Sequence, residues 1–129
     1  MTTAVDLATQ AGIAISCAIV DAGGHVILLE RMDGGRFHTV HSCTTKAVCA
    51  ASNRRPNMTK GAAGQDLDLG HALGLALAAG PELWTAMEGG VPVLVDGQCL
   101  GGVGVSGGDW ENDVRIAKAS VEAIGASWK

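Results

Sequence analysis

Aromatic residues are scarce in this chain. The 129 residues include three Trp, one Phe and no Tyr, so aromatics make up 3% of the sequence although 47% of it is hydrophobic. The core must therefore be built from Val, Leu, Ile and Ala. The length suffices for one such core, and we expect a single domain spanning residues 1–129.

Features typical of several other protein classes are also missing. The formal net charge is −4 and no basic cluster is present, which argues against nucleic acid as a partner. No apolar run reaches the roughly 18 residues that a membrane span needs. The first residues lack the basic and apolar regions of a signal peptide. These absences predict a cytoplasmic protein with neither a nucleic-acid nor a membrane partner.

The four cysteines, at positions 17, 43, 49 and 99, do not have the spacing of a zinc or redox site. No two of them form the C-x-x-C pattern that such sites use. We expect reduced, mostly buried thiols and no metal site.

Glycine is abundant, with 19 residues, and it is densest between positions 89 and 108. Two β-rich runs flank Asp96-Gly97, a dipeptide that supplies the positive φ values of a two-residue hairpin turn. This turn predicts the cross-strand pairs Val95–Gln98, Val93–Leu100 and Val91–Gly102. The glycines after the turn indicate close approach by another backbone, a helix or a ligand.

Patterns of apolar residues predict the remaining elements. Helical spacing predicts helices over residues 3–11, 37–52, 65–79 and 109–124, and strands are predicted over 13–20 and 25–31. The last helix is the best defined, because Asp109 stands where an N-cap belongs. Residues 81–87 form a connector with room for a further edge strand. The order αββααββα, with about five strands, predicts a two-layer α+β domain whose antiparallel sheet is covered by helices.

Seven segments, taken in order, resemble the GlcG/HbpS-like family of haem-binding or haem-degrading domains. These segments are Ile19 to Gly24, Glu30 to Gly34, Lys46-Ala47, Gly89 to Val93, Asp96-Gly97, Gly101 to Gly108, and Asp113. The most specific parts are R-M-D-G at 31–34 and the run from G-G-V-P to V-S-G-G. The resemblance implies a profilin-like fold and a homo-oligomer, either a dimer or an octamer built from dimers. It also implies haem as a possible cofactor.

Two histidines are the candidate iron ligands. His38 and His41 are three residues apart and share a helix face, and a haem pocket needs an axial ligand, apolar walls and cations for the propionates. The cations on offer are Arg31, Arg36, Lys46, Arg54 and Arg55. The small number of aromatics is unusual for a haem site. The simpler interpretation is that both histidines are ordinary surface residues.

A cofactor-independent enzyme is the alternative function. Arg31, near a strand end, can clamp a carboxylate through two hydrogen bonds, and Lys46 or His41 could act as base or acid. Gly89-Gly90 could offer backbone N–H groups to an oxyanion. Such an isomerase, lyase or hydrolase would act on a small carboxylated or carbonyl metabolite. A structural ion pair between Arg31 and Asp33 explains these two residues equally well.

Other candidates carry weaker signals. A metal hydrolase would use His38 and His41 with Asp33 or Glu88, but H-x-x-H without an acid at fixed spacing is not specific. Ser106 matches the G-x-S-x-G pattern only formally, because it follows an antiparallel strand, so we expect it to serve a turn or a cap.

We predict that a small molecule binds between the sheet and the helices. The predicted catalytic residues are Arg31, Lys46 and His41. The predicted ligand-binding residues are Asp33, His38, Glu88, Gly89, Gly90, Ser106 and Asp113. The sequence leaves open whether the protein is an enzyme, and a non-catalytic sensor or assembly subunit is a third interpretation.

Overall fold

A four-stranded antiparallel sheet lies at the centre of the fold, in a computed structural model that describes residues 1–129. The strand order is β2-β1-β4-β3. The elements are α1 (Thr2–Gln10), β1 (Ser16–Asp21), β2 (Val26–Arg31), α2 (Thr39–Asn53), α3 (Leu69–Ala79), β3 (Gly90–Val95), β4 (Gln98–Ser106) and α4 (Trp110–Glu122). The α+β class and the order αββααββα are confirmed. The sheet has four strands rather than five, because residues 81–87 form turns and no strand.

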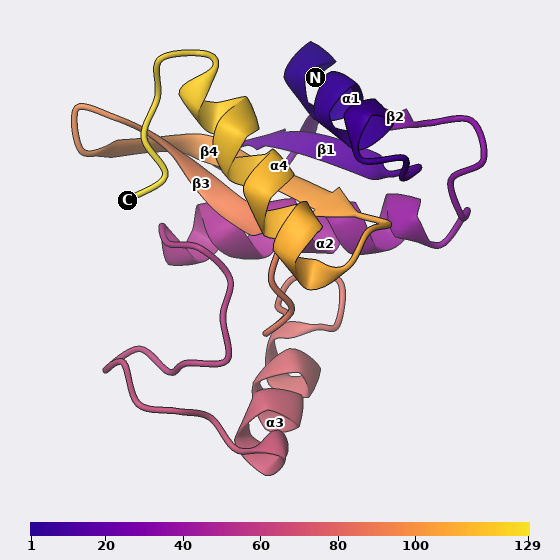
Figure 1. Ribbon diagram of the computed structural model, residues 1–129. Coiled ribbons are helices and arrows are strands. Elements are labelled where there is room, and N and C mark those ends of the chain that lie inside the picture. Colours follow the sequence, from indigo (N-terminus) through magenta and orange to yellow (C-terminus); the bar gives the residue numbers. More distant parts are fainter.

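Helices cover both faces of this sheet (Figure 1). Helix α2 packs along one face, while α4, with α1 beside it, covers the other. Helix α3 stands apart from both layers and projects away from the sheet (Figure 1). None of the four helices combines the length and apolar composition that crossing a membrane requires.

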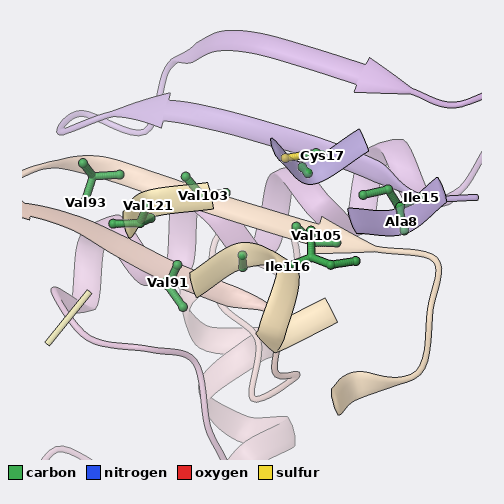
Figure 2. Close-up of a cluster of buried hydrophobic side chains, with 11 residues drawn as sticks. Ala8, Ile15, Cys17, Val91, Val93, Val103, Val105, Ile116 and Val121 are labelled. Atoms are coloured by element: carbon green, nitrogen blue, oxygen red, sulfur yellow. The ribbon is translucent and has the colours of Figure 1, made fainter. Parts of the chain in front are cut away.

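The larger core cluster lies between the sheet and the pair α1 and α4. Figure 2 shows valines of β3 and β4 facing Ile116 and Val121 of α4, with Ala8 of α1 beside Ile15. The buried hydrophobic residues are Val, Ile, Ala and Cys, as the scarcity of aromatics predicts. Leucine is the exception, because no leucine belongs to the buried set. Eight of the eleven leucines are instead exposed.

The predicted hairpin at Asp96-Gly97 is confirmed, with φ of 50° and 77° at the two turn residues. Val95 pairs with Gln98 as predicted. The other two predicted pairs are wrong, because a β-bulge leaves Leu100 as an extra residue on β4. The register past the bulge is Val93–Gly101, Pro92–Gly102 and Val91–Val103.

The glycines of β4 allow α2 to approach the sheet closely. A Cβ at Gly104 would lie 2.6 Å from the backbone nitrogen of Ala47 and closer still to the carbonyl oxygen of Cys43. A Cβ at Gly102 would overlap the carbonyl of Ala47. The close approach that the glycine density predicts is therefore made by a helix backbone.

The N-terminal residues of two helices are held by side-chain caps. Asp109 accepts a hydrogen bond from the backbone N–H of Asn112 at 2.8 Å, which confirms the predicted N-cap of α4. Asp68 does the same for α3, accepting from His71 N–H at 2.8 Å. Because Asp68 is the cap, α3 begins at Leu69 and not at residue 65.

The buried cysteines give a first prediction. Burial raises the pKa of Cys17 to about 12 and that of Cys43 to about 11, and it also raises the pKa of Cys49. Thiolate is the reactive form, so these three should not react at pH 8. We expect dithionitrobenzoate to modify only the half-buried Cys99 in the native protein, and four thiols after unfolding.

The same shifts set the sign of the pH dependence of stability. Unfolded thiols release their protons near the ordinary value of 9.0, whereas folded Cys17 holds its proton to about pH 12. The unfolded state thus binds fewer protons above pH 9, and the free energy of unfolding falls as pH rises, by up to about 1.4 kcal/mol per unit for each thiol. Between pH 9 and 11, the free energy of unfolding of a Cys17→Ala variant should fall less steeply with pH than that of the wild type. Identical slopes for the two proteins would contradict this.

Candidate functional site

A cavity of about 630 Å³ opens where α2, α3 and the start of α4 meet. Its walls come from the first two turns of α2, one face of α3, the segment 81–88, and the connection from β4 to α4. The volume lies within the range of small-molecule and cofactor sites. The sequence predicts a ligand between the sheet and the helices near Arg31, Asp33, Lys46 and Gly89-Gly90, and of these residues only Lys46 lines the cavity.

A buried ion pair between Lys46 and Asp113 lies at the cavity wall. Lys46 Nζ is 2.9 Å from Asp113 Oδ2, and the two residues are only 5% and 3% exposed. Lys46 Nζ also donates to the carbonyl of Val105 at 2.9 Å, and Asp113 Oδ1 accepts from the N–H of Gly108 at 3.0 Å. The pair therefore joins α2, the end of β4 and the first turn of α4, which are the three elements that frame the cavity.

Gly89 and Gly90 lie behind this pair and do not line the cavity. A Cβ at Gly89 would come within 2.8 Å of Asp113 Cβ and 3.1 Å of Lys46 Nζ. A Cβ at Gly90 would overlap the Lys46 carbonyl, which accepts a hydrogen bond from Asn57 Nδ2 at 2.8 Å. Both glycines thus permit close packing around the ion pair, and the structure does not present them to a ligand.

Hydroxyl groups line the wall next to the pair. Ser106 and Ser42 are hydrogen-bonded through their Oγ atoms at 2.7 Å, and both border the cavity. Ser106 has this hydroxyl as its partner and no histidine, so it lacks the base that a nucleophile needs. Arg36 lies at the same rim, where Nη2 donates to the carbonyl of Gly107 at 3.2 Å.

His38 and His41 both line the cavity from the start of α2. His38 occupies the N-cap position and His41 follows in the first turn. Both residues are exposed, and neither ring makes a hydrogen bond within the chain. The ring of Phe37 packs edge-on against His38, with centroids 6.0 Å apart. Two imidazoles are therefore available to a ligand.

Two tryptophans outside the predicted set of site residues also line the cavity. Trp84 is half-buried in the segment 81–88, and Trp110, at the start of α4, is 64% exposed. The sequence does contain a signal that places Trp110 at the site, because Trp110 directly follows Gly107, Gly108 and the N-cap Asp109, next to the predicted site residue Ser106. The third, Trp128, lies elsewhere, with Nε1 donating to Glu122 at 2.8 Å.

The structure brings together six of the predicted site residues. Those lining the cavity are His38, His41, Lys46, Glu88, Ser106 and Asp113. Arg31 ends the edge strand β2, Asp33 lies in the turn after it, and neither lines the cavity. Arg31 and Asp33 also form no ion pair with each other. No three His, Cys, Asp or Glu residues are grouped so that they could hold a metal ion.

Sequence comparisons relate the chain to known proteins. Residues 1–122 match the family model described as haem degrading protein HbpS-like. Protein GlcG of Escherichia coli K12 is 42% identical over 92 residues, which cover 71% of this chain and 63% of GlcG. The match thus spans less than two thirds of that relative. An uncharacterized 15.0 kDa protein of Citrobacter freundii is 31% identical over 127 residues, covering 91% of this chain and 80% of the relative.

Three solved structures with the same fold are 28–29% identical in sequence to this chain. A PduOC:haem complex superposes with a TM-score of 0.85 at 29% identity, covering 98% of this chain and 90% of PduOC. Protein ORFY of Klebsiella pneumoniae gives 0.83 at 28% identity, over 96% and 83% of the two chains. An HbpS double mutant of Streptomyces reticuli gives 0.77 at 28% identity, over 96% and 80%.

Proposed function

The chain belongs to the HbpS-like haem-degrading protein family, and from this membership we propose that it binds haem in the cavity between α2, α3 and α4. The observation that carries the proposal is the set of side chains at one cavity: two free imidazoles, two indoles and an arginine. The volume of about 630 Å³ suits a cofactor of this class. A related domain, PduOC, has been crystallised as a haem complex.

Each group has a separate role in this proposal. His38 or His41 offers an imidazole nitrogen to the iron, which is a common protein ligand of haem. Trp84 and Trp110 provide flat apolar surfaces for the macrocycle, and Arg36 offers its guanidinium to a propionate. Bound haem would supply iron redox chemistry, and the chain supplies the ligand, the apolar walls and the charge. A cofactor-independent enzyme has less support, since its carboxylate clamp, Arg31, lies outside the cavity.

Haemin titration tests this function. The wild-type protein should give a saturable Soret band with one haemin per chain. Mutation of residues that only hydrogen-bond to a metal ligand typically lowers metal affinity about 10–100-fold. Removal of the iron ligand itself, by His38→Ala or His41→Ala, should therefore weaken haemin binding by at least about tenfold. His25→Ala removes an exposed histidine from the turn between β1 and β2, outside the cavity, and is the matched control. An unsaturable spectrum, or equal binding by all three variants, would refute the proposal.

We also propose that the protein is a homo-oligomer of profilin-like domains, with β2 as one contact. The other sheet edge, β3, is covered, because Leu94 exchanges two backbone hydrogen bonds with Ser127 and Gly90 accepts one from Asn57. Strand β2 has no such cover, and Val26 to Leu29 are 38–67% exposed. An apolar edge without Lys or Pro invites pairing with another strand. Antiparallel pairing with β2 of a second copy would cover it.

A lysine on this edge should separate the copies. Leu28→Lys places a charge where the second β2 would pair, and we expect the solution mass to fall to half or less. Leu100→Lys changes a similarly exposed leucine at the β4 bulge and should leave the mass unchanged. A wild-type monomer at micromolar concentration, or an unchanged mass for Leu28→Lys, would contradict the contact.

A further inference from the structure

The segment 81–88, which connects α3 to β3 (Figure 1), forms one wall of the cavity although little in the chain holds it there. Six of its eight residues line the cavity, Trp84 among them. The segment contains no helix or strand, and none of its side chains belongs to either buried hydrophobic cluster. Neither regular structure nor the core therefore accounts for its position.

The sulfur of Cys49, on α2, makes the only hydrogen bonds between this segment and the rest of the chain. Sγ donates to the carbonyl of Thr85 at 3.4 Å and accepts from the Thr85 N–H at 3.5 Å. Asn53 Nδ2, one turn further along α2, donates to the same sulfur at 3.5 Å. Burial raises the pKa of the Cys49 thiol, so the sulfur keeps the hydrogen that the carbonyl accepts. One side chain thus satisfies both backbone polar groups of Thr85.

The ends of the segment do not fix its path. Each end is a glycine with positive φ, 103° at Gly80 and 100° at Gly89. Glycine tolerates a wide range of backbone angles, so the chain can leave these two positions in several directions. Between them, the contact at Thr85 is the one point at which the segment is hydrogen-bonded to α2.

The other buried cysteine of α2 shows that burial alone does not produce such contacts. Cys43 is 0% exposed and Cys49 is 1% exposed. The Cys43 sulfur donates only to the carbonyl of Val40, one turn back in its own helix, at 3.3 Å. The Cys49 sulfur instead binds the backbone of a residue 36 positions further along the chain. Cys49 therefore has a long-range contact that its neighbour lacks.

We propose that Cys49 is a positioning residue of the cavity, whose thiol holds the backbone of Thr85 and thereby sets the indole of Trp84 as a cavity wall. Trp84 directly precedes Thr85, so the two bonds at Thr85 fix where the indole begins. An indole face is a flat apolar surface for a ligand. A wall that is in place before binding also avoids the free-energy cost of ordering it on binding. That the ligand is haem rests on the proposed function, whereas the placement of Trp84 by Cys49 does not.

The fluorescence of Trp84 tests this placement without any ligand. In a Trp110→Phe/Trp128→Phe background, Trp84 is the one remaining tryptophan. Cys49→Ala should red-shift its emission and increase its quenching by acrylamide, because the segment loses its attachment and opens locally. Cys43→Ala removes an equally buried sulfur from the same helix and should change neither quantity. Equal quenching in the two variants would overturn the inference.

Haemin affinity tests whether Cys49 acts through Trp84. Cys49→Ala should weaken haemin binding about fivefold, the effect of losing one hydrogen bond of ordinary strength. Cys49→Ser keeps a donor and an acceptor and should restore most of the affinity. In a Trp84→Ala background, Cys49→Ala should weaken binding no further, since residues that act as a unit are not additive. Additive losses would overturn the positioning role. If the wild type bound no haemin but the fluorescence changed as described, the haem proposal alone would fall.

Discussion

Replacing Gly104 by alanine should destabilise the protein by more than about 4 kcal/mol, at the extreme of single-substitution effects, or prevent folding. The added Cβ would overlap the carbonyl oxygen of Cys43 and lie 2.6 Å from the nitrogen of Ala47. Both atoms belong to the backbone of α2, so no side chain can rotate away to make room. Urea unfolding followed by circular dichroism would measure the loss, with expression of folded protein as the first readout.

Gly97→Ala provides the matched control for this prediction. Gly97 has a positive φ of 77° at the hairpin tip, but a Cβ there would meet no atom within 4 Å. Its cost is therefore backbone strain alone, about 1–2 kcal/mol. If Gly104→Ala cost no more than Gly97→Ala, α2 would not lie on β4 as the structure places it.

Lys46→Met should reduce the free energy of unfolding by about 3–5 kcal/mol, the usual cost of leaving one buried charge without its partner. Asp113 would keep its hydrogen bond from Gly108 but lose the ammonium 2.9 Å away. Lys60→Met removes a surface partner of Asp66 in an exposed pair and should cost less than about 1 kcal/mol. Chemical denaturation of the two variants side by side makes the comparison.

A second substitution separates the buried charge from lost packing. Lys46→Met/Asp113→Leu removes both charges, and apolar pairs often replace buried ion pairs without loss. We therefore expect the double variant to recover most of the stability lost by Lys46→Met. Equal costs for Lys46→Met and Lys60→Met would show that the pair does not hold the three elements together.

Features with short-range causes could be predicted from the sequence. The Asp96-Gly97 turn requires positive φ at two adjacent residues, and the α4 cap requires an acceptor three residues before Asn112, which Asp109 supplies. Each feature is therefore determined by a few neighbouring residues. The strand register beyond Val95 could not be predicted, because the bulge at Leu100 depends on how the whole strand meets its neighbours. The absence of a fifth strand likewise depends on what residues 81–87 pack against.

The same distinction applies to the site. His38, His41 and Lys46 lie on one helix, and their spacing alone places them near one another. Trp84 comes from a connector far along the chain, and only the folded arrangement brings it to the same cavity. Arg31 and Lys46, which both lie in family motifs, are predicted to share a site, yet Arg31 ends the edge strand β2 and does not line the cavity. Motif membership does not fix position.

The most direct test of the haem proposal is to map where a porphyrin binds. Gallium protoporphyrin is diamagnetic, so its effect on the amide signals of the ¹⁵N-labelled protein can be followed through a titration. The proposed site predicts saturable shifts concentrated at residues 36–46, 84–88 and 106–113, with little change at the hairpin tip 96–97. Shifts centred on β2 or the hairpin, or no saturable shifts at all, would contradict the assignment of this cavity to haem.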